Sequence, residues 1–552
     1  MSPDASPPRD PLDADLDLLA GRKEAWGALA LEERAACFEA ALERIPAAAP
    51  EWVRRLEEIQ GLEPGSPWSG ELWLSGPVAT ARGFRLLAAS LRQAGRPALP
   101  GPRPAPGGRT AVRVFPAQAW DRFLLPGVRA EVWLPPGMPI EQGPAGGPPR
   151  LGLVLGAGNI SAIPPTDLMT RMAVDHQVCV LKLNPVQESL RPVFEEVLEP
   201  LIRDGFLRIT GGGPETGRRL TDDPRIEAIH LTGSDRTHDA IVWGADSDEQ
   251  ARRKAEGRPR PEVAGKILTS ELGCVTPVIV APGRWTRAEL AAQAASVAGM
   301  VTHNAHHNCN AAQVLVLPAG WQQAGIFLDA LREALRRAPP RRAWYPGARE
   351  RHRALLEDHP GAELLGAADP PWALIPDLPP RPGERLYREE AFCGVLGVTR
   401  LPAPDALSFL LAAADFCNEV LWGTLSCMLL VDPRTERRLG PGLDEVLARL
   451  RYGGVAVNAW AGLLFGLMSP SWGAWPGHSL ADIGSGIGVV HNTFLLRGPE
   501  KSVLRAPFRL RPKALWRPDH RTLDRLGPAL LTFECRPSWR RGLRLLGPAL
   551  RA

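Results

Sequence analysis

The segment HNAHHNC, residues 303–309, places a cysteine in a polar turn that carries several histidines and leads into the apolar run 313–317. Polar exposure and neighbouring cations favour the thiolate, which is the nucleophilic form of a cysteine. A thiolate in such a turn can attack a carbonyl carbon and form a covalent intermediate. Cys309 is therefore the first candidate for a catalytic residue.

The same turn reads HxxHHxC, and histidine and cysteine are residue types that bind zinc. All four ligands, His303, His306, His307 and Cys309, would fall within one short segment, and no distant partner completes the set. We therefore expect no metal site and keep zinc binding as an alternative.

Glycines and a lysine follow two apolar runs in the central region. Gly156 and Gly158 lie in LGLVLGAGN, where a buried strand is expected to run into a turn that ends at Asn159. Ligands bind at the carboxyl ends of strands in parallel α/β sheets. Lys182 ends the next apolar run, from which its ammonium group can reach a ribose or a phosphate. Each of these residues can also be explained without a ligand: the glycines could simply form a tight turn, and Lys182 could be an ordinary surface lysine.

Three further motifs follow or precede apolar runs. In LTGS, residues 231–234, Gly233 and Ser234 are expected to open a helix, and free N–H groups at a helix N-terminus suit a pyrophosphate. In SELG, residues 270–273, the Glu271 carboxylate beside a glycine is a candidate general base. Glu390 lies in EEAFCG, which precedes another apolar run.

The elements that position these residues alternate between strands and helices. We expect strands at 151–160, 176–184, 206–212 and 226–234, with helices at about 166–175 and 188–203. This alternation predicts a parallel, doubly wound α/β sheet. A second α/β block is expected to start with the run 266–273.

Helical spacing of apolar residues predicts helices over 12–60 and 78–93, followed by a Pro/Gly-rich loop at 94–110. The polar segment 246–265 is expected to be an exposed insertion. The Arg- and Pro-rich tail from about 515 is expected to be only partly ordered. Its leucines and arginines could also rest on a membrane surface, although a solvated end is the favoured interpretation.

Composition narrows the class of protein. The chain has 552 residues, of which 44% are hydrophobic, and its net charge is only +4. This length predicts two to four structural units, and so small a net charge argues against nucleic acid as the main partner. The eight cysteines form no CxxC pair, so we expect a cytoplasmic protein. No apolar run is long enough for stable membrane insertion.

The order of the motifs carries more information than any motif alone. The chain contains, in this order and near the spacing of a known family, GxGN, Lys, TGS, SELG, NxxxxC, EExF, NxxxxG and GxVxVN. Over roughly residues 20–510 this series resembles the aldehyde dehydrogenase superfamily. The resemblance implies two doubly wound parallel-sheet domains, an oligomerisation strand, and oxidation of an aldehyde to a carboxylic acid with NAD or NADP.

Carried over by motif, the resemblance implies a role for each candidate. Cys309 would be the nucleophile and Glu271 the general base, and Asn159 would supply the side-chain half of the oxyanion hole. The cofactor-binding residues would be Lys182, Ser234, Gly233, Glu390, Gly156 and Gly158. The aromatic residues Trp460, Phe465, Trp472 and Trp475 would line a bulky apolar tunnel or belong to the core.

The resemblance also implies an organisation for the whole chain. We expect a dinucleotide-binding domain with N-terminal helices at 1–270 and a catalytic domain at 271–465. Residues 466–552 would return to the cofactor domain and supply an oligomerisation strand near 501–505. The expected assembly is a homodimer or homotetramer, with a small aldehyde as the substrate.

The chain departs from the family pattern at four places. His238 stands where a second phosphate-loop glycine is common, Cys274 replaces the second glycine after the base, and His306-His307 replaces the Gly-Gln before the nucleophile. Pro185 stands where NAD-preferring members often carry a glutamate. Without that carboxylate, repulsion of a 2′-phosphate is lost, which permits NADP as well as NAD.

Two alternatives within the same fold remain. One is a coenzyme A-acylating aldehyde dehydrogenase or acyl-CoA reductase, although Glu271 favours water as the acyl acceptor. The other is a catalytically idle binding protein, which the changes at His238 and His306-His307 keep open and which retention of Cys309 argues against.

Overall fold

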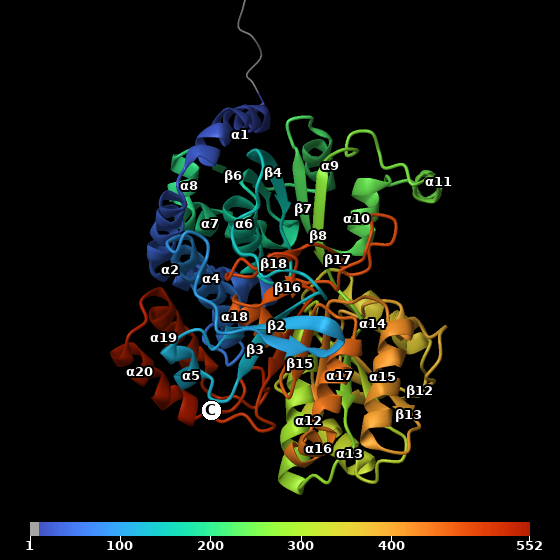
Figure 1. Ribbon diagram of the computed structural model, residues 1–552. Coiled ribbons are helices and arrows are strands. Elements are labelled where there is room, and N and C mark those ends of the chain that lie inside the picture. Colours follow the sequence, from blue (N-terminus) through green and yellow to red (C-terminus); the bar gives the residue numbers. More distant parts are fainter. Residues whose placement is uncertain (1–9) are drawn as a thin grey trace, which may run out of the picture.

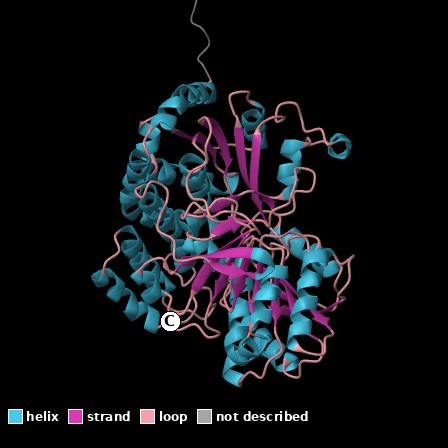
Figure 2. Ribbon diagram, viewed as in Figure 1, coloured by secondary structure: helices cyan, strands magenta, loops and turns pink. Residues whose placement is uncertain are grey.

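The computed structural model describes residues 10–552 and has two sheet-containing lobes stacked one above the other (Figure 1). Strands form the centre of each lobe and helices cover their faces (Figure 2). This is the α/β architecture with parallel sheets that the sequence predicts.

The upper lobe contains a sheet of six strands within the described residues, in the order β17-β8-β7-β4-β5-β6. The strands are β4 (Arg150–Leu155), β5 (Gln177–Lys182), β6 (Leu207–Thr210), β7 (Ala228–Gly233), β8 (Ile267–Leu272) and β17 (Gly486–Ile487). All of them run parallel except β17, which pairs antiparallel with β8. Every residue of β5 is buried, as expected for a strand covered by helices on both faces.

Helices connect and cover these strands: α6 (Ile163–Ala173), α7 (Arg191–Val197), α8 (Glu199–Arg203), α9 (Pro214–Asp222), α10 (Asp235–Val242) and α11 (Ser247–Glu256). The segment predicted to be an exposed insertion contains α11, which has no buried residue.

The N-terminal helices pack against the upper sheet. They are α1 (Pro11–Ala28), α2 (Leu31–Gln60), α3 (Ser69–Trp73) and α4 (Ala79–Leu91). Two buried tryptophans fasten them to α6 and its preceding turn: Trp26 donates to the Met172 carbonyl at 3.1 Å and Trp52 donates to Ser161 Oγ at 2.9 Å. Both indole N–H groups thus keep a partner although their rings are fully buried.

The lower lobe contains a sheet of eleven strands within residues 10–552, in the order β1-β2-β3-β19-β15-β14-β9-β10-β13-β12-β11. Its N-terminal and C-terminal members are β1 (Arg103–Ala105), β2 (Arg109–Phe115), β3 (Arg129–Leu134) and β19 (Lys501–Arg505). The central members are β9 (Thr276–Val280), β10 (Ala312–Pro318), β11 (Glu363–Leu365), β12 (Trp372–Leu378), β13 (Val395–Leu401), β14 (Ser426–Leu430) and β15 (Gly454–Val457).

The helices of this lobe are α12 (Arg287–Thr302), α13 (Ala324–Arg337), α14 (Ala348–Glu357), α15 (Ala406–Val420), α16 (Pro433–Leu439) and α17 (Pro441–Arg449). Strands β9, β10, β13 and β14 pair in parallel, which places their amino ends at one edge of the sheet.

The run 266–273 does not begin the second block as we expected. Its strand β8 pairs with β7 over six residues, so it belongs to the upper sheet. The chain crosses to the lower lobe only after Leu272, through Gly273 to Val275, and then enters β9. The apolar pattern of 266–273 fits either sheet, and pairing with β7 decides between them.

Strand β19, where we expected an oligomerisation strand, lies inside the lower sheet. It pairs in parallel with β15 on one side and antiparallel with β3 on the other. Because both of its edges are paired within one chain, β19 offers no open edge to a second copy in this arrangement.

The C-terminal part of the chain crosses between the lobes before it ends in two helices. It contains α18 (Gly462–Leu467), the paired strands β16 (Ser471–Gly473) and β18 (Val489–His491), α19 (Leu523–Cys535) and α20 (Trp539–Leu550). The tail that we expected to be partly ordered is therefore a helical hairpin. It packs on α5 (Ala119–Leu124) through Trp120, whose ring lies 4.5 Å from Trp539 and 6.2 Å from Phe533. Within residues 10–552, no helix combines the length and the apolarity needed to cross a bilayer.

Candidate active site

The site lies where one edge of each sheet meets the other. Lys182, Gly233 and Leu272 end parallel strands of the upper sheet, with Glu271 one residue before the end of β8. The segments that carry Cys309 and Glu390 precede the neighbouring strands β10 and β13 of the lower sheet. The topology thus brings together residues that are more than one hundred positions apart in the chain.

The loop that carries Cys309 has an unusual backbone. Three consecutive residues, Asn304, Ala305 and His306, have φ values of 53°, 53° and 71°. Left-handed conformations are disfavoured for residues with a Cβ atom, so the surrounding structure must hold this turn in place.

Side-chain hydrogen bonds supply that support. The Asn304 amide donates to the carbonyls of Asn159 at 3.1 Å and His307 at 2.9 Å. The Asn308 amide donates to the His303 carbonyl at 2.9 Å, and the Trp460 indole donates to the Asn310 carbonyl at 2.8 Å. These bonds fix the loop on both sides of Cys309.

A buried polar network behind the loop involves residues that sequence reasoning missed. Gln60 donates to Asn304 Oδ1 at 3.1 Å, and the Asn304 N–H donates to Glu71 at 3.0 Å. Arg341 completes the network by binding both Glu71 and Gln60. The network ties helices of the upper lobe to the loop that carries the candidate nucleophile.

Asn159 lies against this loop. Its side-chain amide donates to the His307 carbonyl at 3.0 Å, two residues before Cys309. An amide NH₂ group has two hydrogens, so the second remains available for another acceptor.

The electrostatics around Cys309 differ from our expectation of a thiolate stabilised by cations. Burial raises the pKa of the Cys309 thiol well above its ordinary value, and the Glu271 and Glu390 carboxyls raise it further. Burial also lowers the pKa of His306 to about 4 and that of His307 to about 3. Both imidazoles are therefore neutral near pH 7, and the resting cysteine is a thiol.

The histidines of the HxxHHxC segment point to different partners. His306 Nδ1 lies 3.0 Å from the Val301 carbonyl, His307 Nδ1 lies 3.0 Å from the Phe392 carbonyl, and His303 contacts the Asn308 amide. In the part of the chain that the structure describes, His, Cys, Asp and Glu side chains form no group suited to a metal ion. The histidines of this segment therefore do not converge on one point.

Two buried carboxyls face the thiol. Burial, followed by the nearby Asp167, raises the pKa of Glu271 to about 8. Burial, followed by Glu271, raises the pKa of Glu390 to about 8. The Oε1 atom of each carboxyl is buried without a hydrogen-bond partner among the described residues, and such atoms are common where a ligand or reacting group binds.

Gln313, which sequence reasoning also missed, positions Glu390. Its amide donates to the carbonyls of Leu386 at 2.8 Å and Glu389 at 2.7 Å, and its oxygen accepts from the Ala391 N–H at 2.8 Å. Strand β10 thereby holds the segment around Glu390. A Cβ atom on Gly273 would lie only 2.1 Å from Glu390 Oε1, so the absence of a side chain at this glycine makes room for the carboxyl.

Apart from Glu390, the candidate cofactor-binding residues lie at the carboxyl edge of the upper sheet. Lys182 is 7% exposed, and burial lowers its pKa. A Cβ atom on Gly156 would come within 3.1 Å of the Pro164 ring, and one on Gly158 within 2.7 Å of the Asn184 side chain. Both glycines therefore allow a tight turn at the end of β4.

Gly233 and Ser234 are exposed and lead into α10. Ser234 caps this helix by accepting the Thr237 N–H at 3.2 Å. The Arg236 N–H of the same turn donates to the Asp235 carboxylate at 2.8 Å, so an anion at this helix end would have to replace these side-chain acceptors.

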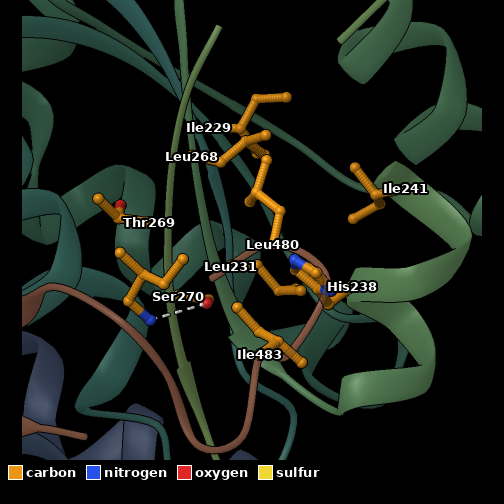
Figure 3. Close-up of a pocket in the computed structure, with 10 residues that line it drawn as sticks. Ile229, Leu231, His238, Ile241, Leu268, Thr269, Ser270, Leu480 and Ile483 are labelled. Atoms are coloured by element: carbon orange, nitrogen blue, oxygen red, sulfur yellow. Dashed lines mark hydrogen bonds between the residues drawn. The ribbon is translucent and has the colours of Figure 1, made fainter. Parts of the chain in front are cut away.

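His238 occupies the space between α10 and the upper sheet. Figure 3 shows its ring pointing from α10 toward the loop that carries Leu480 and Ile483, beside an apolar cavity lined by Ile229 and Leu268. Burial lowers the pKa of His238, so it is a neutral packing residue there.

A large cavity leads from Cys309 to the C-terminal helices. Its volume is about 270 Å³, and Trp460 and Phe465 are among its lining residues. The other two tryptophans singled out in the sequence do not line it. Trp472 is fully buried, and the Trp475 ring lies 4.5 Å from the Lys501 ammonium.

Part of the chain matches a known protein family. Residues 193–344, which include Glu271 and Cys309, match the aldehyde dehydrogenase family. No curated protein sequence matches the chain significantly.

Similar solved structures cover most of the chain. Aldehyde dehydrogenase C from Pseudomonas syringae, a mutant solved with NAD⁺ and octanal, is 16% identical with a TM-score of 0.61 over 90% of this chain and 89% of that one. Gamma-glutamyl-gamma-aminobutyraldehyde dehydrogenase from Burkholderia cenocepacia is 18% identical, with a TM-score of 0.60 over 90% and 89%. Aldehyde dehydrogenase 21 from Physcomitrella patens, solved with succinate, is 16% identical, with a TM-score of 0.60 over 89% of each chain. These likenesses show the fold.

Proposed function

We propose that this chain is a member of the aldehyde dehydrogenase superfamily that oxidises an aldehyde to a carboxylic acid with NAD or NADP, because residues 193–344 match that family and the fold resembles those of solved aldehyde dehydrogenases. The observation that carries the proposal is the placement of Cys309, Glu271 and Asn159 around one point between the two sheets. This arrangement unites a nucleophile, a proton acceptor and an amide donor.

In the first step, the Cys309 sulfur attacks the aldehyde carbon as its proton leaves to a base, and a thiohemiacetal forms. The carbonyl oxygen becomes an oxyanion, which accepts hydrogen bonds from the free Asn159 amide hydrogen and the Cys309 backbone N–H. One preorganised donor of this kind typically contributes about 3 kcal/mol to stabilisation of the transition state.

The residues around the cofactor position fit a nicotinamide dinucleotide. The Lys182 ammonium, the unpartnered Glu390 oxygen and the N-terminus of α10 supply a cation, a hydroxyl-binding carboxyl and an anion site. When bound, the dinucleotide supplies the hydride acceptor for the thiohemiacetal. Pro185 adds no negative charge near the ribose, which permits a 2′-phosphate.

Hydrolysis of the resulting Cys309 thioester needs a base, and Glu271 fits this role. Its raised pKa of about 8 makes the carboxylate a stronger proton acceptor than an exposed glutamate. Glu271 takes a proton from water as the water oxygen attacks the thioester carbon, and the carboxylic acid and the Cys309 thiol are released. We therefore favour water over coenzyme A as the acyl acceptor.

The test compares two variants on a panel of aldehydes with NAD and with NADP, each with and without coenzyme A. Cys309→Ala should abolish production of reduced cofactor and still bind the cofactor. Glu271→Gln should give a single burst of reduced cofactor without steady turnover. If Cys309→Ala kept more than a few per cent of the wild-type rate, the nucleophile and the mechanism would be wrong.

A further inference from the structure

The cavity next to Cys309 is mostly apolar and extends far beyond the reacting atoms. Near the nucleophile it is lined by His303 and Trp460, and elsewhere by Leu526, Leu530 and Leu545 of the C-terminal hairpin. Part of the cavity wall is thus built from α19 and α20 of the same chain.

Most charged residues in the lining are already paired, and Arg511, which also lines the cavity, is exposed to solvent. Arg82 donates to Glu534 at 2.9 Å and to Asp121 at 3.1 Å, and all three side chains are buried. Lys513 donates to Asp519 at 3.2 Å, and burial lowers the pKa of His520 to about 4. Near Arg82 and Lys513, a charged substrate would therefore compete with existing partners, whereas an alkyl chain would not.

We propose that the substrate is a long-chain aliphatic aldehyde whose alkyl chain extends from Cys309 along this cavity toward the C-terminal hairpin. This inference rests on the proposed function. Each methylene removed from water should raise kcat/KM about fourfold, equivalent to about 0.8 kcal/mol, until the chain reaches the distal wall.

The direct test measures kcat/KM for unbranched aldehydes from propanal to tetradecanal. Rising values up to at least decanal are expected. Equal values for propanal and dodecanal would overturn the inference and leave the proposed function intact, whereas no turnover of any aldehyde would count against the proposed function itself.

A variant pair locates the alkyl chain. Ala549 lines the cavity from α20, whereas Leu543 on the same helix is 57% exposed. Ala549→Phe should lower kcat/KM for dodecanal about tenfold or more and leave that for propanal within about twofold, and Leu543→Phe should change neither. Similar losses for both aldehydes in Ala549→Phe would contradict the assignment of the distal wall.

A measurement on the wild-type chain tests the position of the alkyl chain even if Ala549→Phe does not fold. Dodecanol should slow alkylation of Cys309 by iodoacetamide, followed by mass spectrometry, and propanol at the same concentration should not. Equal protection by both alcohols would overturn the inference.

A separate observation concerns the outer face of α20. Trp539, Leu543, Leu546 and Leu550 are 54%, 57%, 37% and 76% exposed. Their spacing of four, three and four residues places them on one stripe of the helix. Arg540, Arg544 and Arg551 are exposed beside this stripe. Figure 1 shows α20 at the outer side of the molecule, away from the two sheets.

We infer that this stripe docks reversibly on a bilayer surface that carries anionic headgroups. A short helix with tryptophan and leucines on one face and arginines beside them lies in the headgroup region without crossing the bilayer. The inner face of the same helix lines the apolar cavity, so docking would bring the cavity wall next to lipid. The positive charge favours anionic lipid over a second copy of this chain.

Co-flotation with vesicles tests this inference. The full chain should float with vesicles of phosphatidylcholine and phosphatidylglycerol and far less with phosphatidylcholine alone. Leu543→Asp should reduce flotation at least about fivefold, and Leu364→Asp, at an equally exposed leucine in β11, should not. No flotation of the wild-type chain, or a stripe variant that instead converts a dimer to a monomer, would overturn the inference.

Discussion

Replacing Glu271 with glutamine should change how the stability of the protein depends on pH. Burial, and then Asp167, raises the pKa of this carboxyl from 4.5 to about 8. The folded chain therefore holds the proton more tightly than the unfolded chain does. The stabilisation is complete below pH 4.5 and is lost as the pH rises toward 8.

The magnitude follows from these two values. At about 1.4 kcal/mol per pH unit, the loss amounts to about 5 kcal/mol over the whole window and about 2 kcal/mol between pH 6 and pH 8. A neutral amide at position 271 does not titrate, so Glu271→Gln should remove this part of the pH dependence.

The assay is urea unfolding of the wild type and Glu271→Gln at pH 6 and pH 8, followed by tryptophan fluorescence. The free energy of unfolding of the variant minus that of the wild type should be about 2 kcal/mol larger at pH 8 than at pH 6, because only the wild type loses stability over this range. Glu357→Gln, at an exposed carboxylate at the end of α14, is the matched control and should show no such difference. An identical difference at both pH values for Glu271→Gln would refute the reasoning.

Three further predictions concern the site. Arg341→Met leaves Glu71 buried without its cation and should lower the free energy of unfolding by about 3–5 kcal/mol, measured by urea denaturation; an unchanged midpoint would contradict the structural role of the network. Gly273→Ala places a methyl group 2.1 Å from Glu390 Oε1 and should weaken cofactor binding about tenfold or more in a fluorescence titration, with wild-type affinity as the contrary result. Steady turnover should rise with pH through about 8 and then level off as Glu271 loses its proton, which a pH–rate profile checks; a flat profile from pH 6 to pH 9 would rule out Glu271 as the base.

The sequence predicts the upper sheet well because its strands alternate with helices and are apolar along their whole length. In β4 and β5, the apolar residues of the sequence are also the residues that are buried in the structure. The boundary at 266–273 was harder to predict because β8 has an apolar pattern that either sheet accepts. The antiparallel extension β1 to β3 and its union with β19 depend on pairing between segments hundreds of residues apart.

The candidate site was predictable as a set of residue types and not as an electrostatic environment. The polar residues around Cys309 in the sequence indicate an exposed, positively charged turn. In the structure, however, His306 and His307 are buried and neutral. The sequence also gives no sign that Arg341 and Glu71, 270 positions apart, form one ion pair behind the loop. Burial and distant pairing are tertiary properties, and no local pattern reports them.

The C-terminal hairpin shows the limit of compositional reasoning. Arginine and proline enrichment suggests a poorly ordered tail, but Leu526, Phe533 and Leu545 are buried and give α19 and α20 a core of their own. The same helices also form part of the cavity wall, so a segment that composition assigns to solvent contributes to the shape of the candidate substrate site.

The charge state of the site links its electrostatics to its chemistry. A Cys309 thiolate would face two carboxyls in a buried environment, so the folded chain keeps the thiol protonated at rest. Glu271 and Glu390 also hold their protons below about pH 8, which avoids three negative charges at one point. Because the site is buried, only one of the two groups, the Cys309 thiol or the Glu271 carboxyl, can be anionic without a large electrostatic cost. In the proposed mechanism, Cys309 is anionic during acylation and Glu271 is anionic during hydrolysis. The two groups are then never charged at the same time, and acylation followed by hydrolysis requires this order.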